Sequence, residues 1–106
     1  MIDPLAFLRE MLDALDDLPE KVLIADELIQ EGAVCAIGSV GKSRGIDMAK
    51  LDPEDPDQVA ATFGISSALS REIAYVNDEW NRNDTPAERF VRVRAWVVKQ
   101  LEFPGT

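Results

Sequence analysis

The residues best suited to chemistry lie near the middle of the chain, where residues 36–43 read AIGSVGKS. This run nearly matches the phosphate-binding loop G-x-x-x-x-G-K-S/T, with Ala36 in place of the first glycine. In that loop, backbone N–H groups hold phosphates, the lysine reaches the outer phosphates and the hydroxyl contacts Mg²⁺. Here the apolar run that ends in Asp26 precedes the loop instead of following it, and no strand–helix–strand units follow Ser43. The sequence therefore argues against an ATP-dependent enzyme.

A helix explains the same stretch better. Within residues 32–45, Cys35, Gly38 and Gly41 are spaced three apart, so a helix here has a face with almost no side chains. Each interior glycine costs up to about 1 kcal/mol relative to alanine, which favours a close neighbour that a Cβ would push away. We expect a buried central helix over Gly32–Gly45, with another helix packed against its small-residue face.

Other catalytic and metal-binding chemistry has little support. The chain has no histidine, which removes histidine-based triads and the commonest metal ligand. Cys35, the single cysteine, lies among apolar residues, where a thiol is usually inert. Residues 77–88 resemble a calcium loop loosely, but Arg82 stands where that loop requires glycine. We predict no catalytic, cofactor-binding or metal-binding residue, and a protein that is not an enzyme.

Residues 56–76 resemble part of a DNA-binding helix-turn-helix. An apolar–alanine pair at Val59-Ala60 is followed by Gly64, as in the first half of that motif. The second half fits less well, because Ser70 stands where the motif has an apolar core residue, and Arg71 is the one base of the presumed recognition helix. A DNA-binding regulator is therefore the alternative function, beside a structural unit of two packed helices.

Arginine and tryptophan gather toward the C-terminus. Both residue types are enriched at binding hot spots, so they could form a docking surface. The competing interpretation is a solvated basic face that pairs with the acidic first half of the chain. The candidate partner-binding residues are Trp80, Arg89, Arg92, Trp96 and Lys99.

Composition indicates one soluble domain spanning residues 1–106. The hydrophobic fraction is 46% and the charged fraction 29%, and no apolar run reaches the roughly 20 residues that span a bilayer. The N-terminus shows no secretory signal, and a single cysteine suits a reducing compartment, so we expect a cytoplasmic protein. The net charge is −9, with nine acids and two bases in residues 1–31. Such acidity disfavours nucleic acid and suits either solubility or a basic protein partner.

Helix signals recur along the chain, and no strand-like alternation accompanies them. Each expected helix start combines a capping side chain with a proline or an apolar repeat. The starts lie at Asp3-Pro4, Asp55-Pro56, Ser66 or Ser67, and Thr85-Pro86, where Glu88 completes a capping box. Further helix is expected over residues 20–31, and Pro104-Gly105 is expected to stop the last helix. These signals predict an all-α fold, a compact bundle of about five to six helices around the central small-residue helix.

The order of these segments is similar to that of small uncharacterised proteins carried by bacteriophages and prophages. The residues concerned are GAVCAIGSVGKSRG, FGIS, YVNDEW and TPAERFVRVRAWVVKQL, spread over residues 32–101. The resemblance implies a phage accessory protein that binds or inhibits a host protein in the host cytoplasm, and some such inhibitors mimic DNA with rows of carboxylates. Together with the charge and the missing catalytic groups, it leads us to expect a non-enzymatic interaction module. Homodimerisation is also possible.

Overall fold

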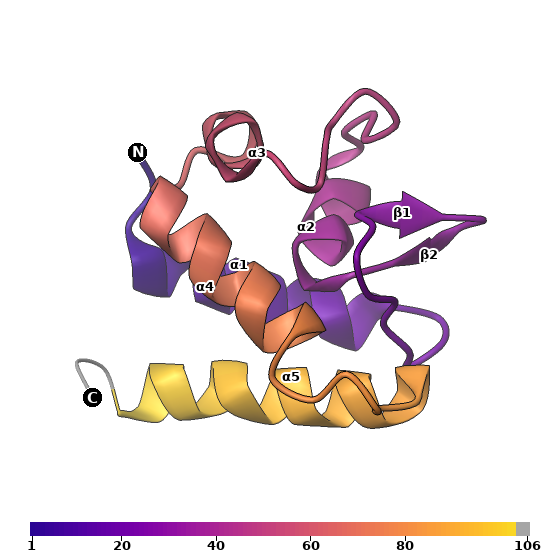
Figure 1. Ribbon diagram of the computed structural model, residues 1–106. Coiled ribbons are helices and arrows are strands. Elements are labelled where there is room, and N and C mark those ends of the chain that lie inside the picture. Colours follow the sequence, from indigo (N-terminus) through magenta and orange to yellow (C-terminus); the bar gives the residue numbers. More distant parts are fainter. Residues whose placement is uncertain (104–106) are drawn as a thin grey trace.

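A computed structural model describes residues 1–103. This part of the chain contains five helices and one short antiparallel hairpin (Figure 1). The elements in chain order are α1 (Pro4–Asp17), β1 (Ile29–Gln30), β2 (Ala33–Val34), α2 (Ala36–Arg44), α3 (Pro56–Phe63), α4 (Ser67–Asp78) and α5 (Pro86–Glu102). The predicted all-α class and compact helical bundle are confirmed, and the hairpin is an addition that the sequence analysis did not predict.

Helix α2 lies in the interior of the molecule. Residues 36–41 of α2 are all buried, and α2 packs against α1, α4 and β2. The long helix α5 lies along one edge of the molecule and packs on α1 and α4, while α3 packs on α4 farther from α5 (Figure 1). Within residues 1–103, no helix combines the length and apolar character needed to cross a bilayer.

The predicted helix starts are confirmed by their capping bonds. Asp3 Oδ2 accepts hydrogen bonds from two backbone N–H groups of the first turn of α1. The side chains of Asp55 and Ser66 each accept one bond at the starts of α3 and α4. The capping box of α5 is complete, since Thr85 and Glu88 each accept the other's backbone N–H. Helix α5 ends at Glu102; the stop expected at Pro104-Gly105 lies outside the described residues.

The prediction of a helix over residues 20–31 is wrong. This segment is an irregular loop with a bend at Asp26, followed by the hairpin that turns at Glu31-Gly32, because other parts of the chain supply its hydrogen bonds. The Leu23 N–H donates to the carbonyl of Pro86, and the Ile24 N–H donates to that of Val34. Pro86 is distant in sequence and Val34 lies across the hairpin, so neither bond follows the spacing of a helix.

The central helix starts later than expected and its small-residue face has a different neighbour. Cys35 is the N-cap of α2, and residues 32–34 belong to the hairpin. A Cβ on Gly38 would stand 2.0 Å from the backbone oxygen of Leu28, and one on Gly41 would stand 2.3 Å from Met48 Sδ. The glycines therefore make room for the segment before the hairpin and for Met48, not for another helix as expected.

Arg44, near the C-terminus of α2, joins three helices. Its guanidinium makes a paired hydrogen bond to the carboxylate of Glu10 on α1, at 2.7 and 2.8 Å, and donates to the carbonyl of Phe63 on α3. It also lies 5.7 Å from the ring centres of Phe7 and Phe63, within cation–π distance. The guanidinium thereby lowers the pKa of the Glu10 carboxyl.

Candidate interaction surfaces

Two adjoining hollows form a groove beside α2. They share Leu18, Pro19 and Lys42, and their volumes are about 290 and 300 Å³. The end of α1, the segment after it, the hairpin turn and α2 enclose the groove. Its lining residues are Ala14, Asp17, Leu18, Pro19, Glu20, Val22, Glu31, Gly32, Ala33, Val34, Ser39, Lys42 and Ser43. We call this surface the acidic groove.

The charged side chains of the acidic groove have no internal partners. Asp17, Glu20 and Glu31 are exposed carboxylates, and Lys42 is an exposed ammonium group. Among residues 1–103, none of these four side chains takes part in a hydrogen bond or an ion pair. Because carboxylates outnumber amines three to one, the groove attracts cationic groups. Between these charges lies an apolar floor that includes Leu18.

The surface elsewhere also carries excess negative charge, because most of the basic side chains are used within the fold. Seven of the eleven basic residues pair with carboxylates or backbone carbonyls inside the described chain: Lys21, Arg44, Arg71, Arg82, Arg89, Arg92 and Arg94. Only six of the twenty carboxylates take part in these ion pairs. One of them is Asp16, whose carboxyl pKa is lowered by the hydrogen bond from Arg94. The protein therefore presents mainly carboxylates to solvent.

The phosphate-binding loop does not form. Residues 36–43 lie within α2, so most of their N–H groups bond along the helix. The N–H groups at its start are occupied too, since that of Ala36 donates to Asn77 Oδ1 and that of Gly38 donates to Cys35 Sγ. The Lys42 side chain lies at the acidic groove, among carboxylates. This arrangement offers no cradle for a phosphate.

Two of the five candidate partner-binding residues, Arg89 and Arg92, bond internally. Arg89 is 6% exposed, and its guanidinium donates to the carbonyls of Leu23 and Asp84. Its Nε is buried without a partner. Arg92 pairs with the Asp84 carboxylate at 2.5 Å and donates to the carbonyl of Val76. Neither arginine fits the expected docking surface, because each one fastens α5 to neighbouring loops and helices.

The other three candidates differ in exposure: one is buried in the core and two are exposed. Trp96 is 9% exposed and belongs to the core, not to a surface as the sequence analysis proposed. Trp80 is 55% exposed, just beyond the end of α4. Lys99 is exposed on α5, and its side chain has no partner within the described chain. The structure thus leaves Trp80 and Lys99 exposed, whereas Arg89, Arg92 and Trp96 are engaged within the fold.

The helix-turn-helix of residues 56–76 is formed in space. Helices α3 and α4 pack together across a short turn, where Gly64 has a φ of +76° and Ile65 is buried. Ser70 is buried at 2% exposure, at the position where the DNA-binding motif has an apolar residue. Arg71 is exposed on α4, with Glu72 beside it and Asp57 3.7 Å away. Such a face carries little attraction for a phosphate backbone.

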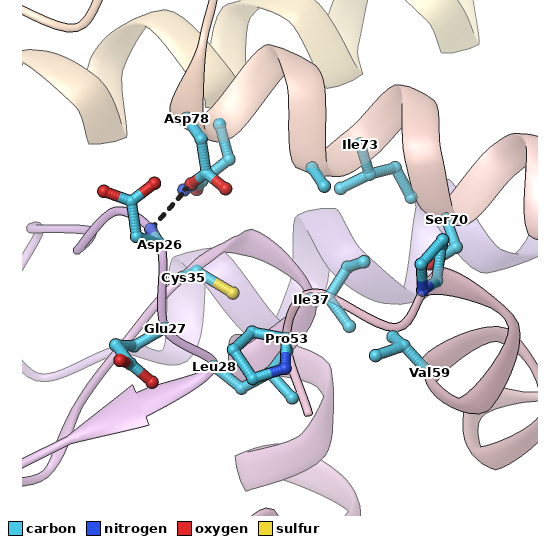
Figure 2. A pocket seen from close by; sticks show the side chains of 13 residues that line it. Asp26, Glu27, Leu28, Cys35, Ile37, Pro53, Val59, Ser70, Ile73 and Asp78 are labelled. Atoms are coloured by element: carbon cyan, nitrogen blue, oxygen red, sulfur yellow. Dashed lines mark hydrogen bonds between the residues drawn. The ribbon is translucent and has the colours of Figure 1, made fainter. Parts of the chain in front are cut away.

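A small pocket lies beside Cys35, which forms part of its wall (Figure 2). Cys35, Leu28 and Ile37 all line this pocket, and Asp26 is held at its edge because its N–H donates to Asp78 Oδ1 (Figure 2). The free volume is about 40 Å³, room for a few water molecules and far less than a small-molecule site requires. Burial raises the pKa of the Cys35 thiol to about 12. The thiol is therefore a poor nucleophile.

Asn77 is the residue whose role the sequence analysis missed. It is 2% exposed, its Oδ1 accepts from the Ala36 N–H, and its Nδ2 donates to the carbonyl of Ile24 and to Asp78 Oδ1. Asn77 thereby joins α4 to the start of α2 and to the loop before the hairpin. Its place in a polar run suggested a turn or a calcium loop. Across residues 1–103, no group of histidine, cysteine and acidic side chains is arranged to hold a metal ion.

No protein-family model, curated protein or solved structure matches this chain.

Proposed function

We propose that this protein is a non-enzymatic interaction module that binds a partner protein through the acidic groove. The observation that supports this proposal is the set of three unpaired carboxylates, Asp17, Glu20 and Glu31, around an apolar floor. The chemistry that fits such a groove is a protein segment with lysine or arginine side chains beside apolar ones. Charge complementarity of this kind raises association rates and selects partners.

The resemblance to phage accessory proteins favours a host protein as this partner. Binding would then inhibit the host protein, either because the carboxylates mimic DNA or because they block a defence protein. The single cysteine suits a reducing compartment and supports a cytoplasmic encounter.

Charge reversal in the groove tests the proposal. We would purify the tagged protein from a bacterial lysate at low ionic strength and identify partners present in stoichiometric amounts. The variant Glu20→Lys/Glu31→Lys should lose the partner. The wild-type complex should also dissociate as salt rises toward about 1 M, where the screening length falls to about 3 Å.

A matched control separates the groove from overall charge. Glu54 and Glu72 are exposed, lie outside the groove and make no ion pair within the described residues, so Glu54→Lys/Glu72→Lys changes the net charge equally. This control should keep the partner. Recovery of no stoichiometric partner, or equal loss by both variants, would contradict binding in the groove.

A DNA-binding regulator is the second candidate, favoured by the α3–turn–α4 geometry around Gly64. Fluorescence anisotropy with labelled duplex DNA at low salt would detect it. Binding that Arg71→Ala abolishes and Arg9→Ala preserves would support this function, because both arginines are exposed but only Arg71 lies on α4. No change in anisotropy at low salt would eliminate it.

A further inference from the structure

Helix α5 has a second apolar face that no other element of the described chain covers. Its inner face is buried against the rest of the protein, and in Figure 1 it lies along the lower edge with the other elements above it. On its outer side, Ala87, Val91 and Ala95 are exposed at intervals of four residues, so they follow one line along the helix. Val91 is 67% exposed, and with Glu88 and Arg92 it lines a shallow hollow of about 360 Å³.

The charges beside this face are complementary to those of a second copy placed antiparallel. Glu88 and Lys99 lie on the same flank of the face, eleven residues or about 16 Å apart along the axis. Antiparallel pairing about a twofold axis near residues 93 and 94 brings Glu88 of each copy opposite Lys99 of the other. Glu88 uses Oε1 for the capping box, so Oε2 remains available. Parallel pairing would set this flank of one copy against the opposite flank of the other, so neither Glu88–Lys99 pair could form.

Two further charges lie at this face, Glu102 and Arg94. Glu102 is exposed at the end of α5 and would stand opposite Thr85 of the other copy, not opposite a carboxylate. Arg94 lies on the opposite flank near the twofold axis, where it would face its own copy, but Asp16 pairs with it. Residues 85–103 carry a net charge of +2, and the rest of the chain carries the acidic excess. Helix α5 is therefore outside the acidic excess, and a second copy that approaches it does not bring two strongly acidic surfaces together.

We propose that the outer face of α5 is a homodimer interface. Two α5 helices cross antiparallel, and Val91 of each copy packs between Ala95 and the half-buried Val98 of the other. One Glu88–Lys99 ion pair forms at each end of the contact. A 17-residue helix is about 25 Å long, so this contact is small for a specific interface. We expect a dissociation constant in the micromolar range, about 1–100 µM. This surface is separate from the acidic groove, so either proposal can fail without the other.

Sedimentation equilibrium of the whole chain, at concentrations up to about 500 µM, tests the interface. The wild type should dimerise, and Val91→Glu should raise the dissociation constant at least tenfold. Tyr75→Glu is the control, because Tyr75 is 59% exposed on α4 and should not affect association. A wild type that stays monomeric, or a Val91→Glu variant that dimerises normally, would overturn the proposal.

Charge exchange tests the antiparallel arrangement. Glu88→Lys and Lys99→Glu should each weaken self-association, and an equimolar mixture of the two variants should associate as a heterodimer. Glu88→Lys also removes half of the capping box, so its thermal melt is measured beside that of Glu88→Gln, which keeps a capping acceptor. Single variants that dimerise like the wild type, or a mixture that does not associate, would overturn the antiparallel pairing.

Discussion

Replacing Gly38 with alanine should destabilise the protein, although alanine is the better helix former. The added Cβ would stand 2.0 Å from the Leu28 oxygen, 3.0 Å from its carbonyl carbon and 3.1 Å from Val34 Cβ. An ordinary carbon–oxygen contact is about 3.3 Å or longer, so α2 and the segment around Leu28 must separate by more than about 1 Å. That oxygen also accepts the Cys35 N–H at 3.2 Å, and the separation strains this hydrogen bond.

The expected loss in the free energy of unfolding is the balance of opposing contributions. Overpacking in a filled interior costs about 1–3 kcal/mol, and the strained hydrogen bond costs about 1 kcal/mol. Alanine in place of an interior glycine of a helix returns up to about 1 kcal/mol. The net loss for Gly38→Ala is therefore about 2 kcal/mol, which lowers the melting temperature by roughly 8–16 °C in a chain of this size.

Gly41→Ala is the matched control on the same helix. Its Cβ would stand 2.3 Å from Met48 Sδ, the flexible part of a side chain that can move aside at small cost. Gly41→Ala should remain within about 1 kcal/mol of the wild type, and Lys42→Ala within about 0.5 kcal/mol. Urea unfolding followed by circular dichroism measures all three variants. A Gly38→Ala protein as stable as Gly41→Ala would refute close packing of Gly38 on the backbone.

Three further results are expected from single positions. Arg89→Ala should lower the free energy of unfolding by about 2–4 kcal/mol in urea titrations, because it leaves the buried carbonyl of Leu23 without its donor; unchanged stability would contradict a structural role. Arg44 depresses the folded pKa of Glu10 below its ordinary value of 4.5, so this pair stabilises the fold above about pH 4.5 and less as pH falls through the folded pKa. Glu10→Gln should therefore be less stable than the wild type at pH 7, with a difference that shrinks in acid; a difference independent of pH would contradict the pairing. Cys35 should react with a thiol reagent only after unfolding, since burial raises its pKa to about 12; rapid labelling of the native protein at pH 8 would contradict its burial.

The ends of the helices were predictable because their signals are local. Asp3, Asp55, Ser66 and Thr85 each accept a backbone N–H two or three residues ahead, so a short window of sequence contains both partners. Gly64 closes α3 for a similar reason, since its φ of +76° suits glycine. These local bonds define four of the five described helices and thus most of the fold class.

The candidate site was less predictable, because side-chain direction depends on distant partners. Arg89 and Trp96 suggested a docking surface by residue type, yet one bonds to the Leu23 carbonyl and the other fills the core. The acidic groove combines Glu20, Glu31 and Lys42 from three separate segments. No spacing in the sequence reveals that these residues meet.

The sequence by itself determined where four helices start, that the fold is helical, and that the chain carries nine more negative than positive charges. Tertiary structure decided that residues 20–31 form a loop and a hairpin strand instead of a helix, because Pro86 and Val34 supply hydrogen bonds that a helix would have made internally. It also decided which charges reach solvent: most arginines bond across the fold, while the carboxylates of the acidic groove remain unpaired. Charge can be counted along a chain, but its exposure depends on which residues the fold brings together.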